Sequence, residues 1–294
     1  MNYQIGENRM KFLIIGCNGM AGHVISLYLK EKGYSVTGYA REKSRFVDTI
    51  IGDATEFDEL KKCIINGKYD TVINCVGLLN QFAESNHTKA ILLNGYLPHY
   101  LAEITENTDI QVIQMSTDCV FSGKTGGYTE SSIPDGRLFY DKTKALGELN
   151  DDKNLTLRNS IVGPDIKKEG IGLLNWFMQQ SKSVDGFTGA IWTGQTTLQL
   201  AKTMEYAALT RVHGLYNMVP DETINKYELL KLFNKYIRQE PIEIVPMDKF
   251  VADKSLIRTQ FDGFDYIVPG YEIMVKELGD WMRSHKEIYP HYKL

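Results

Sequence analysis

Cysteine is scarce in this sequence, with four in 294 residues, and no two of them stand at Cys-x-x-Cys spacing. The six histidines are also scattered, so that no pair has the spacing of metal ligands. We therefore expect neither a disulfide framework nor a structural zinc site, and no metal cofactor. This cysteine usage fits a reducing compartment such as the cytoplasm.

Long hydrophobic runs and a strong charge of one sign are missing as well. No stretch is long and apolar enough to span a bilayer, and the first ten residues, MNYQIGENRM, lack the apolar core of a signal peptide. The formal net charge is only −4, and no long basic run offsets it. We therefore expect a cytoplasmic protein with no membrane and no nucleic-acid partner.

From Lys11 to Val162, short runs rich in valine and isoleucine alternate with amphipathic segments. The expected strands cover residues 11–15, 34–39, 49–51, 70–76, 110–115 and 155–162. A helix is expected over 21–33, where Gly33 is a natural stop. Continuous apolar strands that alternate with helices are typical of a parallel sheet covered on both faces. This part predicts an α/β fold of the Rossmann type, with a doubly wound parallel sheet.

The rhythm changes after Val162. Residues 163–172 are expected to form a loop, followed by one strand over 215–219 and by helices over 173–180, 196–209, 226–237 and 271–286. No proline-rich or serine-rich linker separates the two halves. The simplest prediction is a first domain over 11–162 and a smaller C-terminal lobe over 163–294, with later segments free to return to the first domain.

A glycine-rich loop, GCNGMAG, follows the first expected strand. In such a loop the first glycine permits a tight turn, the second lets the backbone approach a pyrophosphate, and the third lets helix and strand pack closely. The helix N-terminus adds unpaired N–H groups that attract the anion. The spacing is Gly-x-x-Gly-x-x-Gly, not the commoner Gly-x-Gly-x-x-Gly. In this strand-turn-helix context it predicts a dinucleotide site that includes Gly16, Asn18, Gly19, Met20 and Gly22.

The end of the second expected strand indicates which dinucleotide binds. A site for NAD usually carries an acid there, whereas this chain has Arg41, followed by Lys43 and Arg45. A guanidinium suits a 2′-phosphate, so NADPH is favoured over NADH, although a solvated basic loop would give the same pattern. Asp53 and Ala54 follow the third strand, where the acid either accepts from the adenine amino group or caps the next helix.

Five tyrosines have a lysine four residues later, a spacing that places both side chains on one helix face. Only Tyr140 and Lys144 follow shortly after an expected strand that ends in hydroxyl groups, Ser116 and Thr117. A neighbouring ammonium lowers the pKa of a phenol, and a hydroxyl can stabilise a developing alkoxide. This set therefore predicts proton transfer at a carbonyl. For the other four pairs, which begin at Tyr28, Tyr39, Tyr227 and Tyr289, we expect a tyrosine ring that rests on a lysine stem.

These residues resemble a known family, the extended short-chain dehydrogenases/reductases, and within it the dTDP-4-dehydrorhamnose reductases and related sugar-nucleotide reductases. The resemblance covers most of the chain and is carried by NCVG (74–77), NGYLP (94–98), STDCVFSG (116–123), YDKTKALGE (140–148) and LRNSIVGP (157–164), together with the glycine loop. It is weaker in IWTG (191–194), GLYNMVPDE (214–222) and DKSLIRT (253–259). It implies an oxidoreductase that reduces a nucleotide-linked 4-keto-6-deoxy sugar with NADPH for polysaccharide biosynthesis, and it is compatible with a homodimer.

The resemblance also implies roles for individual residues. Tyr140 would donate the proton, Lys144 would bind the nicotinamide ribose and tune Tyr140, and Thr117 would bond the substrate carbonyl, with Ser116 in its place if the register shifts by one. One segment would lie beside the adenosine half, namely Asn74, Cys75, Val76 and Gly77. Further candidates for substrate contacts, which ordinary packing or surface charge would also explain, are Asp118, Cys119, Trp192, Thr193, Lys254 and Arg258.

Two residues depart from the family pattern. Asp141 stands where the family usually has glycine, and we expect it to alter only a helix surface. Cys119 stands where these reductases usually have tyrosine, and where the family's 4,6-dehydratases have the glutamate of their acid-base pair. Dehydration is therefore disfavoured.

Cys119 keeps one bifunctional alternative open. It has the spacing of the proton-moving cysteine in GDP-L-fucose synthase, an epimerase-reductase, although 167–175 holds no counterpart of that enzyme's histidine. A small buried thiol that packs the strand end is the simpler interpretation. A non-catalytic NADP-binding regulator is the alternative from another class, and the complete set of Thr117, Tyr140 and Lys144 argues against it.

Overall fold

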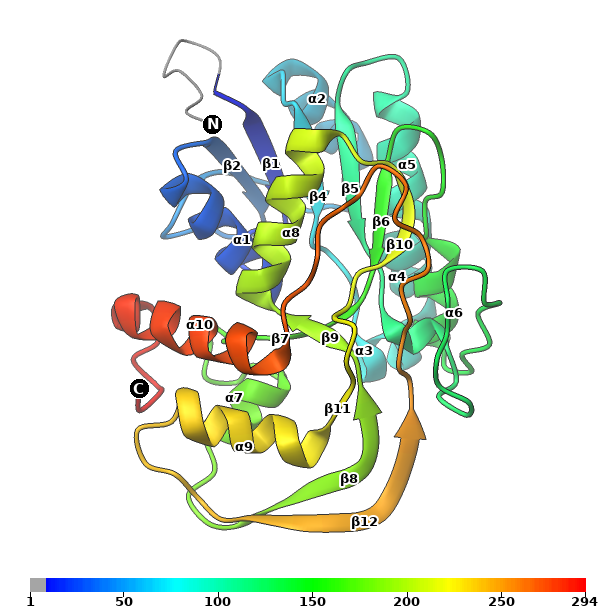
Figure 1. Cartoon of the computed structure of the whole chain (residues 1–294). Helices are drawn as coiled ribbons and strands as arrows, with labels where there is room; N and C mark the ends of the chain where they lie inside the picture. The colour runs from blue at the N-terminus through cyan, green and yellow to red at the C-terminus, as the bar shows by residue number, and fades with distance from the viewer. Residues whose placement is uncertain (1–8) are drawn as a thin grey trace.

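The computed structural model describes residues 9–294, and its centre is a parallel sheet of seven strands in the order β10-β6-β5-β4-β1-β2-β3 (Figure 1). Every pair of neighbours in this sheet is parallel. The strands are β1 (Lys11–Ile15), β2 (Ser35–Ala40), β3 (Asp48–Ile51), β4 (Thr71–Asn74), β5 (Gln111–Met115), β6 (Leu155–Arg158) and β10 (Gly214–Asn217).

Helices cover both faces of this sheet because its central strands are apolar on both sides. Phe12 and Ile14 of β1 point into one core and Leu13 and Ile15 into the other. On the first face α1 (Met20–Glu31) packs beside α8 (Thr197–Thr210). The second face is covered by α2 (Phe57–Gly67) and α5 (Leu97–Thr105). The predicted doubly wound Rossmann-type fold is thus confirmed.

The segments between β4 and β6 lie near the carboxyl ends of the strands. They include α3 (Asn80–Ser85), α4 (His87–Ala90) and a π-helical turn, η1 (Ile91–Tyr96), which leads into α5. After β5 come a 3₁₀ turn, η2 (Asp118–Val120), and α6 (Phe139–Leu146). Helix α6 contacts α3, α4 and η1, so a compact group of short helices stands beside the end of β5.

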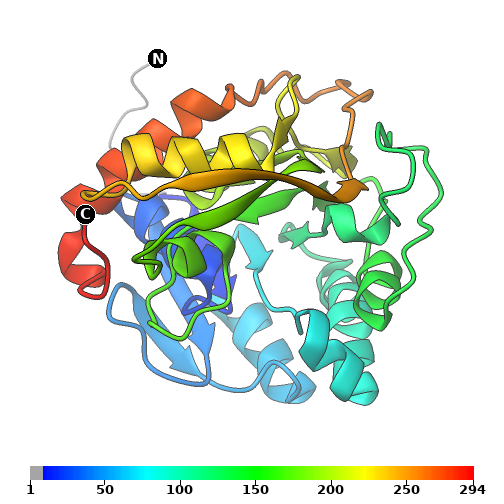
Figure 2. The same cartoon turned by 90° about the horizontal axis from the view of Figure 1, so that it is seen from below.

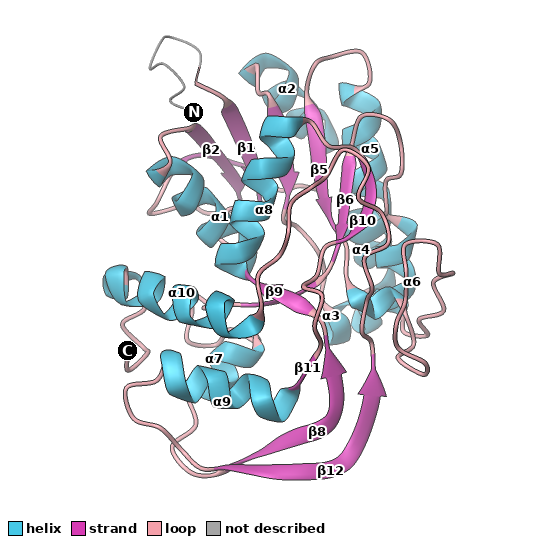
Figure 3. Cartoon of the chain, viewed as in Figure 1, coloured by secondary structure: helices cyan, strands magenta, loops and turns pink. Residues whose placement is uncertain are grey.

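A second, smaller sheet is built from the C-terminal half of the chain, and Figure 3 shows its strands apart from the large sheet. Its order is β11-β8-β12, with β8 (Val184–Trp192), β11 (Ile224–Asn225) and β12 (Ile244–Asp253). Helix α9 (Lys226–Tyr236) packs on β8 and β12 (Figure 2). The remaining elements are α7 (Leu173–Met178), α10 (Tyr271–Ser284) and η3 (Lys286–Ile288). The chain returns to the first sheet at α8 and β10.

Several strands differ from the sequence-based expectation. The strand expected over 155–162 breaks at Asn159: β6 joins the large sheet, whereas β7 (Ser160–Val162) pairs with β9 (Gly194–Thr196) in a separate two-stranded sheet. Four strands, β8, β9, β11 and β12, were not expected. Most of β12 is exposed, so the apolar alternation of a half-buried strand is missing, and β8 contains two glycines.

No helix within residues 9–294 has both the length and the apolar character to cross a bilayer. Residues 1–8 of the N-terminal stretch considered for a signal peptide lie outside the described residues. All four cysteines are free thiols. In the described part of the chain, no group of three or more metal-ligating side chains comes together.

His23 ties the glycine loop to the C-terminal segment. It is fully buried on α1, where Nδ1 donates to the carbonyl oxygen of Gly19 at 2.9 Å and Nε2 accepts from the Tyr289 hydroxyl at 2.8 Å. A neutral imidazole provides this combination of one donor and one acceptor. Burial lowers the pKa of His23 to about 4.

The stability of the fold should therefore fall in acid through His23. Its contribution is complete above the unfolded-state pKa of 6.5 and is lost as the pH falls toward 4. We expect a loss of up to about 3 kcal/mol in the free energy of unfolding from this group alone. Urea titrations at several pH values check this. His23→Gln should be less stable at pH 7, with a stability that changes less between pH 6.5 and 4, and His213→Gln, at an exposed position, should behave as wild type. Parallel pH profiles for all three proteins would contradict the assignment.

Candidate active site

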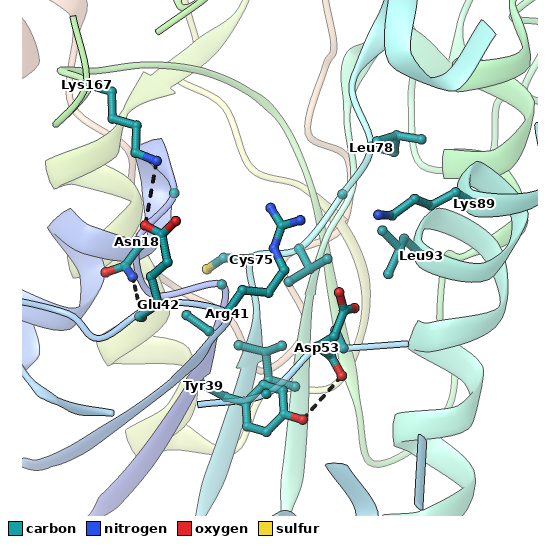
Figure 4. A pocket seen from close by; sticks show the side chains of 18 residues that line it. Asn18, Tyr39, Arg41, Glu42, Asp53, Cys75, Leu78, Lys89, Leu93 and Lys167 are labelled. Atoms are coloured by element: carbon teal, nitrogen blue, oxygen red, sulfur yellow. Dashed lines mark hydrogen bonds and ion pairs between the residues drawn. The ribbon is translucent and has the colours of Figure 1, made fainter. Parts of the chain in front are cut away.

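A cleft of about 390 Å³ opens at the carboxyl ends of β1, β2 and β4, where a doubly wound sheet places ligands. Figure 4 shows its lining side chains converging from the glycine loop, the end of β2 and the segment after β4. Nine of the residues predicted to bind the cofactor line it: Gly16, Asn18, Gly19, Arg41, Asp53, Ala54, Cys75, Val76 and Gly77.

The glycine loop has the geometry that a pyrophosphate site requires. Gly16 has a φ of +82°, and a Cβ on Gly22 would lie 2.2 Å from the carbonyl oxygen of Gly16. Beyond its chain neighbours, a Cβ on Gly19 would meet one atom of the described residues within 4 Å, that same oxygen at 3.3 Å. Helix α1 begins directly after Gly19, so its first N–H groups face the cleft. The loop therefore fits a dinucleotide phosphate.

Five residues predicted for the cofactor do not line the cleft, and two of them, Tyr140 and Lys144, lie at the end of β5. Gly22 serves the packing of α1 on the loop, and Met20 lies against the loop at Gly172. Asn74 is fully buried: its Nδ2 donates to Gln114 Oε1 at 2.8 Å, and its Oδ1 accepts from the Val76 amide at 3.1 Å. Asn74 thus stabilises the turn beside the cleft without lining the cleft itself.

Cationic side chains from three segments face the cleft. Arg41 at the end of β2 was predicted from the sequence, whereas Lys89 on α4 and Lys167 in the loop 163–172 were not. Figure 4 shows the head groups of Arg41 and Lys89 directed into the same space as the Asp53 carboxylate. Lys167 is paired with Glu42 at 3.8 Å across the rim. Neither added lysine belongs to a motif, because both reach the cleft through tertiary structure.

Asp53 organises the turn before α2. Its Oδ1 accepts from the amide of Thr55 at 3.0 Å and from the Thr55 hydroxyl at 2.8 Å. The hydrogen bond from the Thr55 amide is the main reason that the pKa of Asp53 is lowered. The positive charges of Lys89 and Arg41 act in the same direction. The alternative that Asp53 caps the next helix is wrong, since the residue before α2 is Glu56.

Thr117, Tyr140 and Lys144 come together at the end of β5. Tyr140 and Lys144 lie on α6 and are both buried, and Lys144 Nζ donates to the carbonyl oxygen of Met115, the last residue of β5, at 2.6 Å. The Thr117 hydroxyl donates to Asp118 Oδ1 at 3.1 Å and accepts from the Cys119 amide at 3.1 Å, and it lies close enough to the Tyr140 phenol to act on its pKa. The three polar groups therefore stand around one strand end, next to the segment 75–78 of the cleft.

Ser116 and Thr117 were both candidates for the hydroxyl beside Tyr140, and the contacts of Ser116 decide between them. Its hydroxyl donates to Glu148 Oε1 at 2.6 Å, and Glu148 is paired with Arg158 at 2.6 Å in a buried network. Ser116 thus points away from Tyr140, and Thr117 is the hydroxyl beside the phenol.

The pKa values at this site are dominated by burial. Burial raises the pKa of Tyr140, with Cys119 adding to the rise, while the hydrogen bond with Thr117 opposes it. Burial lowers the pKa of Lys144 to about 8. The expectation of a phenol with a lowered pKa is therefore wrong, because desolvation dominates and raises the pKa of Tyr140. At neutral pH the pair is a protonated phenol beside an ammonium.

The structure also corrects the interpretation of Asp141. It is buried and its Oδ2 accepts from the amides of Arg137 and Leu138 at 3.1 and 3.0 Å, so it holds the turn that begins α6. The expectation that it alters only a helix surface is wrong. The reason is the chain before α6, which folds back over the carboxylate and removes it from solvent.

Cys119 and Asp118 face two lysines from the C-terminal half. Although burial acts to lower it, the pKa of Lys254 is raised by the nearby Cys119 and Asp118. Burial raises the pKa of Asp118 and raises that of Cys119 to about 12. The cysteine is thus a protonated thiol at neutral pH, which disfavours its use as a base.

Lys226, the first residue of α9, was missed by the sequence analysis. Its Nζ lies 4.8 Å from the ring centroid of Trp192, and the pairing of Ile224 with Trp192 fixes this position. Burial lowers the pKa of Lys226 to about 8, and the nearby Asp118 acts in the opposite direction. No sequence signal marks it, because only the arrangement of the two sheets brings α9 near β5.

The other predicted substrate contacts serve packing in part. Trp192 is buried under Lys226, and the Thr193 hydroxyl accepts from the Leu256 amide at 2.8 Å. Arg258 is buried, and its guanidinium donates to the carbonyl oxygens of Gln260, Tyr266 and Phe264. Of the two interpretations left open for Arg258, these bonds favour packing over a substrate contact, since the side chain holds its own loop together.

Among the other Tyr-x-x-x-Lys pairs, two show the expected packing. Lys32 Nζ lies 5.4 Å from the ring centroid of Tyr28, and Lys231 Nζ lies 5.1 Å from that of Tyr227. Tyr289 is buried against His23 instead.

Comparison with known proteins adds a family match. The model of a family described as RmlD substrate binding domain matches residues 10–260. A probable low-salt glycan biosynthesis reductase, Agl14 of Haloferax volcanii, is 32% identical over 143 residues, which are 47% of this chain and 48% of that protein. The match thus spans about half the length of that relative.

Two further similarities extend over more of the chain. Methionine adenosyltransferase 2 subunit beta of Xenopus laevis is 27% identical over 233 residues, 74% of this chain and 69% of that protein. The solved structure of a hypothetical dTDP-4-dehydrorhamnose reductase from Sulfolobus tokodaii has a TM-score of 0.70 and 25% identity, covering 84% of this chain and 92% of that one.

The buried ammonium of Lys144 should make the protein less stable at neutral pH than it would be without it. Its pKa of about 8 lies below the ordinary 10.5, so Lys144→Met should raise the free energy of unfolding at pH 7, by up to about 3 kcal/mol. Because the unfolded chain binds more protons between pH 8 and 10.5, this difference should shrink over that range. Urea unfolding at pH 7 and pH 10 measures both effects. Lys142→Met, at an exposed position of the same helix, should change little, and a Lys144→Met variant less stable than wild type at pH 7 would refute the argument.

Proposed function

The chain belongs to the RmlD substrate binding domain family, and from this membership we propose that it is an NADPH-dependent reductase of a nucleotide-linked 4-keto-6-deoxy sugar. The observation that carries the proposal is the meeting of Thr117, Tyr140 and Lys144 at the strand end next to the cleft. A glycan biosynthesis reductase and a hypothetical dTDP-4-dehydrorhamnose reductase among the similar proteins support this reaction class. A role in deoxysugar and polysaccharide biosynthesis follows from it.

The two lobes divide the work in this proposal. Residues 11–162, with α8 and β10, form the cofactor-binding part, and the small sheet with α9 forms the substrate-binding part. A homodimer and a cytoplasmic location stay predictions.

The cofactor would be held mainly by backbone and by cations. Gly16, Gly19 and the first N–H groups of α1 would bind the pyrophosphate, and Arg41 with Lys89 would bind the 2′-phosphate. When bound, NADPH supplies the hydride for the carbonyl carbon. Lys144 would hold the nicotinamide ribose through the ammonium that now donates to Met115.

The proton for the carbonyl oxygen would come from Tyr140. Its raised pKa keeps the phenol protonated at neutral pH, which is the state that a proton donor needs. Thr117 lies beside the phenol, and its hydroxyl, which now donates to Asp118, would donate to the same carbonyl oxygen and lower the cost of charge on it. Lys144, with a pKa of about 8, is mostly charged at pH 7 and favours the phenolate that remains after transfer.

A non-catalytic regulator is the second candidate, because a methionine adenosyltransferase 2 subunit beta matches 74% of this chain. The buried ammonium of Lys144 speaks for catalysis, since a binding protein has no need of a lysine whose burial costs stability. An epimerase-reductase that uses Cys119 is less well supported, because the pKa of about 12 keeps the thiol protonated.

Removal of one hydroxyl tests the proposal. Tyr140→Phe should lower kcat by roughly 10²- to 10⁴-fold, because the proton donor is lost while the ring still packs. NADPH binding, measured by fluorescence titration, should stay near the wild-type value. The assay follows NADPH absorbance with a panel of nucleotide-linked 4-keto sugars, and Tyr96→Phe, at an exposed tyrosine, is the control.

Two outcomes would decide against the reductase. A Tyr140→Phe variant that keeps its turnover would remove Tyr140 from the reaction. A wild-type protein that binds NADPH but oxidises it with none of the sugars would favour the regulator.

Cofactor preference should depend on Arg41. Arg41→Ala removes a guanidinium that faces the cleft, so the KM for NADPH should rise about tenfold or more, the worth of one charge-assisted hydrogen bond. The KM for NADH, which lacks the 2′-phosphate, should hardly change. Arg45→Ala, in the same exposed loop but outside the cleft lining, should leave both values unaltered. An equal rise for the two cofactors would argue against a 2′-phosphate site at Arg41.

A further inference from the structure

The segment from Leu78 to Lys89 connects the cofactor cleft with the helix that carries Tyr140. Leu78 and Lys89, at its two ends, line the cleft. Between them lie α3 and the start of α4, both of which contact α6. One stretch of chain therefore touches the cofactor side and the proton-donor side of the site.

Glu84 on α3 makes the central contact. Its Oε1 accepts from the amide of Phe139 at 2.6 Å and from the amide of Tyr140 at 3.2 Å. These two residues begin α6, where amides have no acceptor within their own helix. A carboxylate at this end also interacts favourably with the helix dipole. Glu84 thus binds the backbone of the very residue whose phenol faces Thr117.

Two other contacts hold the same helix start. The ring of His87 stacks on Phe139 with centroids 3.9 Å apart and planes 17° from parallel. From inside, Asp141 accepts from the two amides that precede the helix, those of Arg137 and Leu138. Only Glu84, however, bonds to Tyr140 itself among these side chains, so it has the most direct control over where that residue stands.

We propose that Glu84 is a positioning residue for Tyr140, one that fixes the first turn of α6 and links it to the segment lining the cofactor cleft. The inference rests on the proposed reductase function. Glu84 touches none of the reacting atoms and acts through the two backbone amides. Because the efficiency of proton transfer depends steeply on placement, a small shift of α6 should cost far more in rate than in stability.

Because Glu84 is exposed, its effect on the position of Tyr140 can be measured separately from any effect on folding. An exposed side chain such as this one contributes little to global stability, so its loss should leave the fold intact. Gln81 offers a matched control on the same helix, since it is also exposed and its side chain makes no hydrogen bond within the described residues.

Steady-state kinetics give the first test. Glu84→Ala should lower kcat about tenfold with less than about a twofold change in the KM for NADPH, because the donor is misplaced while the cleft remains. Glu84→Gln keeps an oxygen acceptor and should recover most of the rate. The deuterium isotope effect on kcat with 4-deuterated NADPH should grow in Glu84→Ala, since the chemical step becomes slower. Gln81→Ala should match wild type in every measurement.

Amide hydrogen exchange gives a second test that needs no turnover. In Glu84→Ala the amides of Phe139 and Tyr140 should exchange about tenfold faster, whereas the end of α6 should keep its protection. Exchange that is unchanged at these two amides, with unchanged kcat, would overturn the proposal. A second pattern would also overturn it. In that pattern kcat and Tm both fall in Glu84→Ala, Glu84→Gln does not restore the rate, and the isotope effect is unaltered, as expected for a merely structural residue. If wild type reduces none of the sugars, the proposed function fails, while the exchange experiment still judges Glu84.

Discussion

The hydrogen bond from the Lys144 ammonium to the last carbonyl of β5 is the interaction on which the site depends. It joins α6 to the end of a central strand, and so it places Tyr140 next to Thr117. The bond requires a charged group in a buried position, and burial lowers the pKa of Lys144 against the opposing charge of Glu148. Glu148 is itself fixed by Arg158 and by Ser116. Buried polar groups thus hold Lys144 in place, although the burial of its ammonium costs stability. Such a cost is typical of a residue that is retained for function.

Most of the large sheet could be predicted from the sequence because its strands are locally unmistakable. The central ones are short, apolar and separated by helix-period segments, and their burial on both faces gives them the continuous apolar runs typical of a parallel sheet. The small sheet could not be predicted in the same way. Its edge strand β12 is exposed over most of its length, and β8 contains Gly186 and Gly189, so neither has the pattern of a core strand. Pairing between distant segments, and not local propensity, makes them strands.

The residues of the candidate site can likewise be divided into those that a local sequence pattern predicts and those that only tertiary contacts bring to the site. The glycine loop and the Tyr140–Lys144 pair are local patterns, and the structure brings both to the strand ends. Lys89, Lys226 and Glu84 carry no local signal, because tertiary contacts alone bring them to the site. Burial is equally invisible in a sequence, which is why the direction of the Tyr140 pKa shift was predicted wrongly and why the sequence left open whether Arg258 contacts a substrate or packs within its own loop.

Burial also sets the order in which the two central groups lose their protons. The pKa of Lys144 is lowered to about 8, whereas that of Tyr140 is raised above its ordinary value of 10.0. As the pH rises, the lysine therefore loses its charge before the phenol ionises. A reduction needs a phenol that still holds its proton and an ammonium that stabilises the phenolate left behind. Both conditions hold together below pH 8, and the first to fail above it is the charge of the lysine. In the proposed reaction, the site would therefore be limited on the alkaline side by Lys144, which supports the donor, and not by the donor itself.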